Sequence, residues 1–279
     1  MDGWAEKRWC TRKELESLIS SLQHACKVIR PGRSFLRRAI SLLSVAKKPG
    51  HFIRLNKEFR SDLMWWKLFA RDWNGTGIIT SPDQQDIFLT SDASGFWGCG
   101  AWCGQDWFQL EWSPCSKGKS IAVKELIPII IAAAIWGPHW RGKAVCARCD
   151  NSAVVAVIRS RSSKEKDLMQ LLRCLWFFEA SHQFHLYSRH IPGVENSLAD
   201  DLSRDRLGEF LEKAGRVNAT PSYIPPSLLQ WLLSPQQDWT SQSWISQFSS
   251  FVRRGECSTH YHYHYCWLIP LFNIAKYNS

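Results

Sequence analysis

Beyond residue 86, the spacing of apolar residues changes from a helical period to short strand-like runs, and this change decides which folds are available. The expected strands cover residues 87–92, 98–103, 107–112, 143–150 and 184–190. The expected helices cover residues 120–136, with Pro128 as a kink, and residues 151–159, 164–180 and 195–206. Three strands, a helix, a strand, two helices, a strand and a helix predict an α/β domain with a mixed sheet.

The first 80 residues are helical in pattern. Amphipathic helices are expected over residues 11–30, 33–46 and 56–73. Thr11 and Glu14 have the spacing of a capping box at the start of the first helix, and Pro31 is expected to end it. The second helix is expected to turn Ile40 and Val45 inward and to show Arg33, Arg37 and Arg38 on its other side. This part of the chain is therefore predicted to be a small helical region that precedes the α/β domain.

Positive charge is concentrated in the same helical region. The chain has a formal net charge of +10 and a pI of about 9.2, and residues 1–80 hold 16 Lys and Arg against 7 Asp and Glu. Such an excess favours a polyanionic partner such as nucleic acid, although an ordinary solvated helix face explains it equally well. The candidate phosphate-binding side chains are Arg33, Arg37, Arg38, Lys47 and Lys48.

Cysteine and apolar patterns indicate an intracellular protein that does not enter a membrane, with nuclear or cytoplasmic residence left open. Ten cysteines show no framework spacing, so reduced thiols are expected. Cys146 and Cys149 should point to opposite faces of a strand, which argues against a zinc site. No apolar run follows Met1, and the longest one, residues 126–136, is too short to cross a bilayer. Most of the 16 tryptophans are expected in the core.

Four carboxylates stand where expected strands end or helices begin: Asp92, Glu125, Asp150 and Asp200. Taken singly, each is explained by a turn, a helix cap or a solvated surface. Taken together, they are placed to converge at one rim of the sheet. Four hard oxygen donors suit Mg²⁺ or Mn²⁺ rather than zinc, and two such ions about 4 Å apart support in-line phosphoryl displacement.

The motifs around these acids resemble those of ribonucleases H associated with reverse transcriptases. The matching segments are residues 90–101, 124–126, 149–151 and 190–204. The resemblance covers about residues 85–205, and it implies a ribonuclease H-like five-stranded mixed sheet flanked by helices. The whole chain also resembles part of the polyprotein of DIRS-type retrotransposons, in which a polymerase precedes the nuclease and a tyrosine recombinase follows it.

The resemblance implies an endonuclease that cuts the RNA strand of RNA–DNA hybrids with two Mg²⁺ or Mn²⁺ ions and no small-molecule cofactor. Asp92, Glu125, Asp150 and Asp200 would then be both the catalytic and the metal-binding set, with Asp201 as the uncertain neighbour of the fourth acid. The mobile His that cellular enzymes carry in a loop before the last acid is missing, and His190 is not assigned that role. Hybrids are told from DNA by their 2′-hydroxyls, and the residues expected to read them are Ser94, Gly95 and Asn151.

Three regions follow from these patterns. Residues 1–80 are expected to be a basic helical connector from the end of a reverse transcriptase, and residues 85–205 the ribonuclease H-like domain. Residues 206–279 are expected to be a helical and poorly ordered tail that resembles an N-terminal recombinase fragment, with short helices at 227–233 and 240–253. The polymerase part of the same element is a further expected partner. The alternatives are an inactive retroelement relic that only binds nucleic acid, and a structural connector within a larger assembly.

Overall fold

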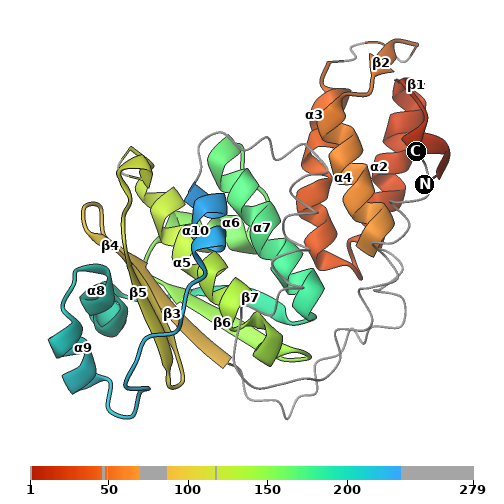
Figure 1. The fold of residues 1–279 in the computed structure, drawn as a ribbon. Helices are drawn as coiled ribbons and strands as arrows, with labels where there is room; N and C mark the ends of the chain where they lie inside the picture. The colour runs from red at the N-terminus through yellow and green to blue at the C-terminus, as the bar shows by residue number, and fades with distance from the viewer. Residues whose placement is uncertain (1, 46–47, 49, 70–86, 117, 234–279) are drawn as a thin grey trace.

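The computed structural model describes residues 2–45, 48, 50–69, 87–116 and 118–233 (Figure 1). The predicted helix at 240–253, the low-complexity segment that follows it, and Lys47 lie outside these residues. No described helix is both long enough and apolar enough to cross a membrane. The described cysteines with a resolved side chain are free thiols.

A five-stranded mixed sheet forms the centre of the α/β domain. Its strands are β3 (Ile87–Ala93), β4 (Gly98–Cys103), β5 (Asp106–Glu111), β6 (Ala144–Cys149) and β7 (His185–His190). The strand order is β5-β4-β3-β6-β7, with β3, β6 and β7 parallel and with β4 antiparallel to both β3 and β5. This order, with the helices below, confirms the predicted α/β class with a five-stranded mixed sheet flanked by helices.

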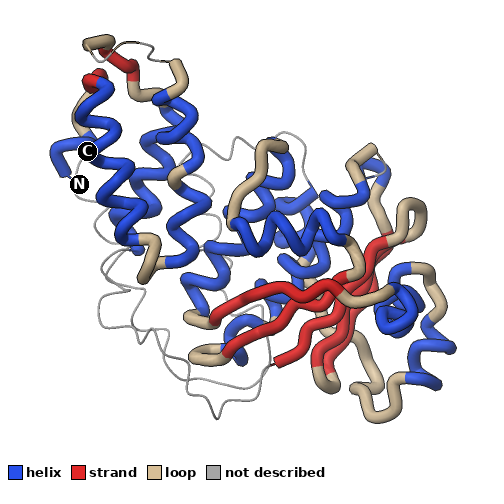
Figure 2. The backbone as a smooth tube through the Cα atoms, turned by 180° about the vertical axis from the view of Figure 1, so that it is seen from behind, coloured by secondary structure: helices blue, strands red, loops and turns tan. Residues whose placement is uncertain are grey.

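Helices cover both faces of this sheet (Figures 1 and 2). One face carries α5 (Ile121–Ile135), α6 (Ser152–Ser160) and α7 (Lys166–His182), and the other carries α8 (Ser197–Ser203) and α9 (Leu207–Lys213). Neighbouring residues of β5 show the division, because Phe108 packs against Trp136 after α5 whereas Trp107 packs against Phe210 of α9. Pro128 lies inside α5, which is assigned as one continuous helix.

The N-terminal region is a helical unit with a small sheet. It contains α1 (Asp2–Ala5), β1 (Trp9–Thr11), α2 (Arg12–Ala25), the 3-10 helix η1 (Arg30–Phe35), α3 (Arg37–Leu43), β2 (Phe52–Arg54) and α4 (Lys57–Phe69). The capping box of Thr11 and Glu14 is confirmed. Pro31 does not end the first helix, which stops at Ala25; Pro31 begins a 3-10 turn instead. Ile40 and Val45 are exposed, so their predicted burial was wrong.

The helical unit shares its core with the α/β domain. Trp65 and Trp66 of α4 are fully buried in the same apolar cluster as the inner residues of α5 and α7. Gly32 lies against Trp66 so closely that a Cβ there would be 2.3 Å from the indole ring. At the same junction, the buried Asp62 carboxylate pairs with Arg38 at 3.0 Å and with Arg173 of α7 at 3.4 Å.

A second polar contact joins η1 to the sheet-covering helices. The Ser34 hydroxyl donates a 2.6 Å hydrogen bond to the carbonyl of Arg161, which follows α6. The Arg161 guanidinium in turn forms a two-pronged ion pair with Glu179 of α7, and both side chains are buried. The predicted boundary between residues 1–80 and 85–205 stays a prediction, but apolar and polar contacts cross it.

The chain after α9 also packs on the domain. The indole of Trp107 donates to the Asn218 carbonyl at 2.7 Å, and the indole of Trp136 donates to Ser222 at 3.0 Å. The last described helix, α10 (Pro226–Leu233), matches the predicted helix at 227–233 and inserts Leu228 into the main core. Burial of tryptophan is confirmed at Trp65, Trp66, Trp107, Trp112, Trp136, Trp140 and Trp176.

Candidate metal centre

The candidate site lies at the edge of the sheet where the three parallel strands end. Because β3, β6 and β7 run in the same direction, their carboxyl ends meet at this edge. Asp92 is the next-to-last residue of β3, and Asp150 follows β6 directly. The 3-10 helix η4 (Gly193–Asn196) follows β7, and a Cβ on Gly193 would lie 3.5 Å from the Asp150 carboxylate. Strand geometry thus brings two of the four acids together.

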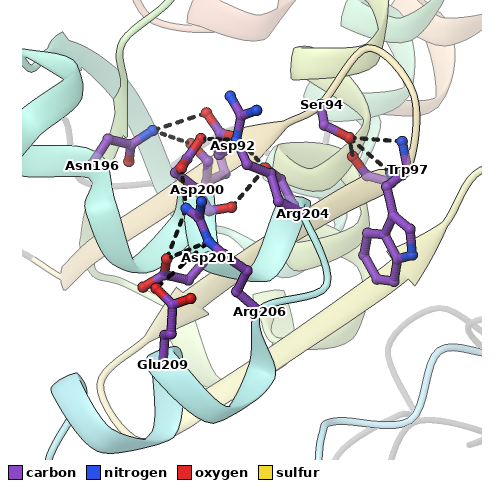
Figure 3. A network of polar contacts seen from close by, with 12 residues as sticks. Asp92, Ser94, Trp97, Asn196, Asp200, Asp201, Arg204, Arg206 and Glu209 are labelled. Atoms are coloured by element: carbon purple, nitrogen blue, oxygen red, sulfur yellow. Dashed lines mark hydrogen bonds and ion pairs between the residues drawn. The ribbon is translucent and has the colours of Figure 1, made fainter.

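Asp92 is held from the side of α8. Its carboxylate accepts a hydrogen bond from the Ser203 hydroxyl and another, 3.2 Å long, from the amide of Asn196 (Figure 3). The close approach of α8 depends on Gly100, which pairs with Asp92 across β3 and β4. A Cβ at Gly100 would lie 2.3 Å from the Leu202 Cβ, so this helix rests directly on the glycine.

Glu125 reaches the same edge from α5. Ser120 caps this helix by accepting from the backbone N–H of Val123, and the first turns of the helix bring Glu125 beside the end of β6. The buried Cys149 thiol donates to the Glu125 carboxylate at 3.8 Å. One ligand atom each from Glu125, Cys149 and Asp150 lies within 4.8 Å of the other two.

Burial and mutual repulsion raise the pKa values of the two innermost acids. Desolvation is the largest cause for both. The pKa of Glu125 rises to about 9, helped by the negative charges of Asp92 and Asp150. The pKa of Asp92 rises to about 6, because burial and the negative charges of Asp150 and Asp200 raise it. The hydrogen bond from Ser203 lowers this pKa, but by less. Three of the predicted acids therefore crowd together, and Asp200 lies near enough to interact electrostatically with Asp92.

Asp200 and its neighbour Asp201 have different surroundings. Asp200 has a 30% exposed side chain, and it pairs with Arg204 and Arg206 on the outside of α8. Asp201 has a 1% exposed side chain, which pairs with Arg206 at 2.8 Å and with Lys213 of α9 at 2.7 Å. Asp201 thus joins α8 to α9. Of the two, Asp200 is the one whose charge acts on Asp92.

The donors at this edge fit a hard divalent cation. The closest partners of the Asp92 and Glu125 carboxylates are neutral: a hydroxyl, an amide, a thiol and a backbone N–H. Two buried carboxylates compensated only weakly by protein cations call for an external positive charge. Oxygen donors of this kind suit Mg²⁺ or Mn²⁺. The ion would bind to Asp92, Glu125 and Asp150 most readily. Asp200 can join them only if it gives up its ion pairs with Arg204 and Arg206.

Two of the three residues expected to read a hybrid make contacts that shape the local backbone. The Ser94 hydroxyl is buried and accepts from the backbone N–H groups of Trp97 and Gly98, each at 3.0 Å, so it shapes the turn between β3 and β4. The Asn151 side chain caps α6 by accepting from the backbone N–H groups of residues 153 and 154. Gly95 is exposed, and a Cβ there would meet nothing within 4 Å, so close packing is not its role.

The predicted phosphate-binding residues divide by exposure. Arg33 and Lys48 are exposed, and Arg37 is half-buried. Arg38 points inward to Asp62 and to the Glu58 carbonyl, which commits its guanidinium to the interior of the helical unit. The expectation that Arg38 faces outward was therefore wrong. The reason is that Asp62, itself buried on α4, needs a cationic partner.

Sequence reasoning gave no role in the site to four residues that contribute to it. Cys149 was considered as half of a rejected zinc motif and as the first residue of the 149–151 segment, without a role of its own, yet its thiol donates to Glu125. Asn196 and Ser203 hold Asp92 across more than 100 residues of sequence. Both lie within the closing motif around Asp200, so the spacing of that motif was the available signal. Lys124 was also missed, although it is buried beside Glu125 and donates to the Gly95 carbonyl.

Comparisons with known proteins give only distant structural likenesses. No protein-family model matches the chain, and no curated protein matches it. An RNase H1 from *Halobacterium salinarum* NRC-1 is 14% identical with a TM-score of 0.35, over 45% of this chain and 99% of that one. LC11-RNase H1 in complex with an RNA/DNA hybrid is 20% identical with a TM-score of 0.35, over 46% and 99%. The N-terminal RNase H domain of a *Mycobacterium tuberculosis* protein is 17% identical with a TM-score of 0.34, over 43% and 98%. Likenesses at this level carry no inference about activity.

Proposed function

We propose that the α/β domain is a divalent-metal nuclease that cuts the RNA strand of RNA–DNA hybrids. The observation that carries the proposal is the meeting of Asp92, Glu125 and Asp150 at one sheet edge, with Asp200 in electrostatic reach. The two innermost carboxylates have raised pKa values, as is frequent where side chains are gathered for function rather than for stability. The motif resemblance supplies the substrate class and the retrotransposon origin, and both are part of the proposal.

The residues of this chain would act by binding and orienting. Two Mg²⁺ or Mn²⁺ ions, when bound, supply activation of water and stabilisation of the leaving oxygen in phosphodiester hydrolysis. Asp92, Glu125 and Asp150 would bind the ions, and Asn196 and Ser203 would hold the Asp92 carboxylate in its orientation. The exposed Asp200 would complete the ligand set. The expected products end in a 3′-hydroxyl and a 5′-phosphate.

The second candidate is a protein that binds nucleic acid without turnover. The pairing of Asp200 with two arginines favours this reading, because an ion pair competes with metal coordination. It shares the fold and the basic N-terminal region with the first candidate, and it differs only in whether the four acids act together on metal.

An assay of hybrid cleavage separates these candidates. The full chain is incubated with a labelled RNA–DNA hybrid in Mg²⁺ and, as a control, in EDTA. We expect Mg²⁺-dependent cleavage that slows by at least about 100-fold in Asp92→Asn, because a lost metal ligand costs several kcal/mol of transition-state stabilisation at about 1.4 kcal/mol per tenfold. Glu111→Gln, which changes an exposed acid of β5, should cleave at the parent rate. Equal cleavage by Asp92→Asn and the parent would eliminate the nuclease proposal.

A further inference from the structure

Two exposed apolar side chains flank the carboxylate edge. Among the large hydrophobic residues that the structure describes, Phe96 and Val194 have the greatest exposure, at 94% and 86%. Phe96 lies in the turn after β3, four residues beyond Asp92, and Val194 lies in η4 next to Gly193, where an added Cβ would lie 3.5 Å from the Asp150 carboxylate. Single exposed apolar residues are ordinary, but here the two most exposed ones both follow strands that end at the carboxylate edge.

The turn that carries Phe96 is held from three directions. The Ser94 hydroxyl accepts hydrogen bonds from inside the turn, at the backbone N–H groups of Trp97 and Gly98. The indole of the buried Trp112 donates to the Ser94 carbonyl at 2.8 Å. The ammonium group of Lys124, a residue with 3% exposure, donates to the Gly95 carbonyl at 2.7 Å. The turn is thus fixed to β5 and to α5 next to Glu125.

A fixed turn with an unburied aromatic ring is suited to binding. The Phe96 side chain is 94% exposed among the described residues, and the exposure of an apolar ring is unfavourable in water. Because the backbone beneath it is already ordered, a partner that covers the ring meets little ordering cost. Phe96 follows β3 and Val194 follows β7, and β6, which ends beside Asp150, lies between these two strands.

We infer that Phe96 is a contact residue that enters the minor groove of the bound duplex, with Val194 as a second contact across the acids. This inference rests on the proposed function, since the strand to be cut must lay a phosphate on the carboxylate edge. Next to that phosphate the turn meets the sugars, and the minor groove of an A-like duplex is wide and shallow enough to admit it. Apolar side chains such as Phe that enter minor grooves commonly insert between neighbouring base steps.

The affinity of the full chain for a labelled RNA–DNA hybrid tests this inference. All variants carry Asp92→Asn, so that the hybrid stays intact, and fluorescence anisotropy in Mg²⁺ gives Kd. We expect Phe96→Ala to raise Kd by at least about fivefold, a loss of the size of one aromatic contact with a base. Phe96→Trp should stay within about twofold of the parent, because it keeps an aromatic ring. Phe52→Ala removes an exposed ring of β2, in the helical unit, and is the matched control with an unchanged Kd.

A photo-crosslinking amino acid at position 96 gives a second readout. Benzoylphenylalanine at position 96 should crosslink to the hybrid, and the same group at position 52 should not. An unchanged Kd for Phe96→Ala, or no crosslink from position 96, overturns the inference. Phe96-dependent binding by a parent protein that does not cleave would leave the inference standing and refute the proposed activity. Cleavage by Phe96→Ala with the parent KM would support the proposed activity and refute the inference about Phe96. Failure of the parent to bind the hybrid would refute both.

Discussion

The raised pKa of Glu125 makes the stability of the metal-free protein depend on pH in a defined direction. Its pKa is about 9 in the folded protein against 4.5 for an ordinary glutamate. Between these values the folded state holds a proton that the unfolded state has lost, so the free energy of unfolding falls as pH rises. A difference of 4.5 pH units at about 1.36 kcal/mol each amounts to about 6 kcal/mol between pH 4 and pH 9.

Glu125→Gln isolates this contribution because it removes the charge and keeps the shape. Asp62 and Asp92 also have pKa values raised to about 6, and they remain in the variant and contribute to both curves. In EDTA, we expect the parent to lose several kcal/mol more than Glu125→Gln between pH 5 and pH 9. The variant should therefore be the more stable protein at pH 9 and the inactive one in the cleavage assay.

Urea unfolding followed by circular dichroism at several pH values measures the difference. Mg²⁺ added at pH 8 should raise the stability of the parent, because a cation that binds the ionised acids favours the folded state. It should do much less for Glu125→Gln. Glu111→Gln, at an exposed position on β5, serves as control and should follow the parent. Parallel curves for parent and Glu125→Gln across the whole range would refute the electrostatic reasoning about this site.

Other consequences of the packing are open to the same unfolding measurement. Gly100→Ala should cost about 1–3 kcal/mol and slow cleavage, because its Cβ would overlap Leu202 and push α8 away from Asp92; a variant as stable and as active as the parent would contradict this. Glu179→Gln should cost about 3–5 kcal/mol, because it leaves the buried guanidinium of Arg161 without its anionic partner; a loss below about 1 kcal/mol would count against it.

The order of elements was predictable from periodicity, whereas short elements were not. The strand predicted at 98–103 is β4 with the same bounds, and the other long elements differ by a few residues. The strands β1 and β2 have three residues each, and α9 has seven, which is too short for a period to show. Their stability comes from pairing and packing: β1 lies on β2, and α9 covers Trp107.

The outward face assigned to α3 failed for a related reason. A helical period says which residues share a face, but it does not say which face meets the rest of the protein. Arg38 is turned inward because Asp62 of α4 is buried and needs a cation, a requirement that arises only once the helices are packed. Because the face of α3 that carries Arg38 meets the rest of the helical unit, Ile40 is exposed to solvent.

The acids of the candidate site were found through their order and spacing, because strand ends and helix starts fix where a side chain stands along each element. The partners of those acids could not be found in the same way. The thiol of Cys149 reaches Glu125 and the hydroxyl of Ser203 reaches Asp92 only through tertiary packing, over separations of 24 and 111 residues. Sequence patterns thus predict the charged groups of such a site more readily than the neutral groups that orient them.

The surroundings of the two adjacent acids on α8 bear on which of them would serve as the fourth ligand. Asp200 pairs with Arg204 and Arg206, whose side chains are 56% and 38% exposed, and exposed pairs of this kind contribute about 0–1 kcal/mol each. Asp201 is 1% exposed, and the loss of its partners would leave a buried charge at a cost of about 3–5 kcal/mol. The free-energy cost of replacing the cationic partners with a divalent ion is therefore small at Asp200 and large at Asp201. The same argument weakens the reading of the Asp200 ion pairs as a mark of an inactive protein, because a contact that is easily given up does not block metal binding.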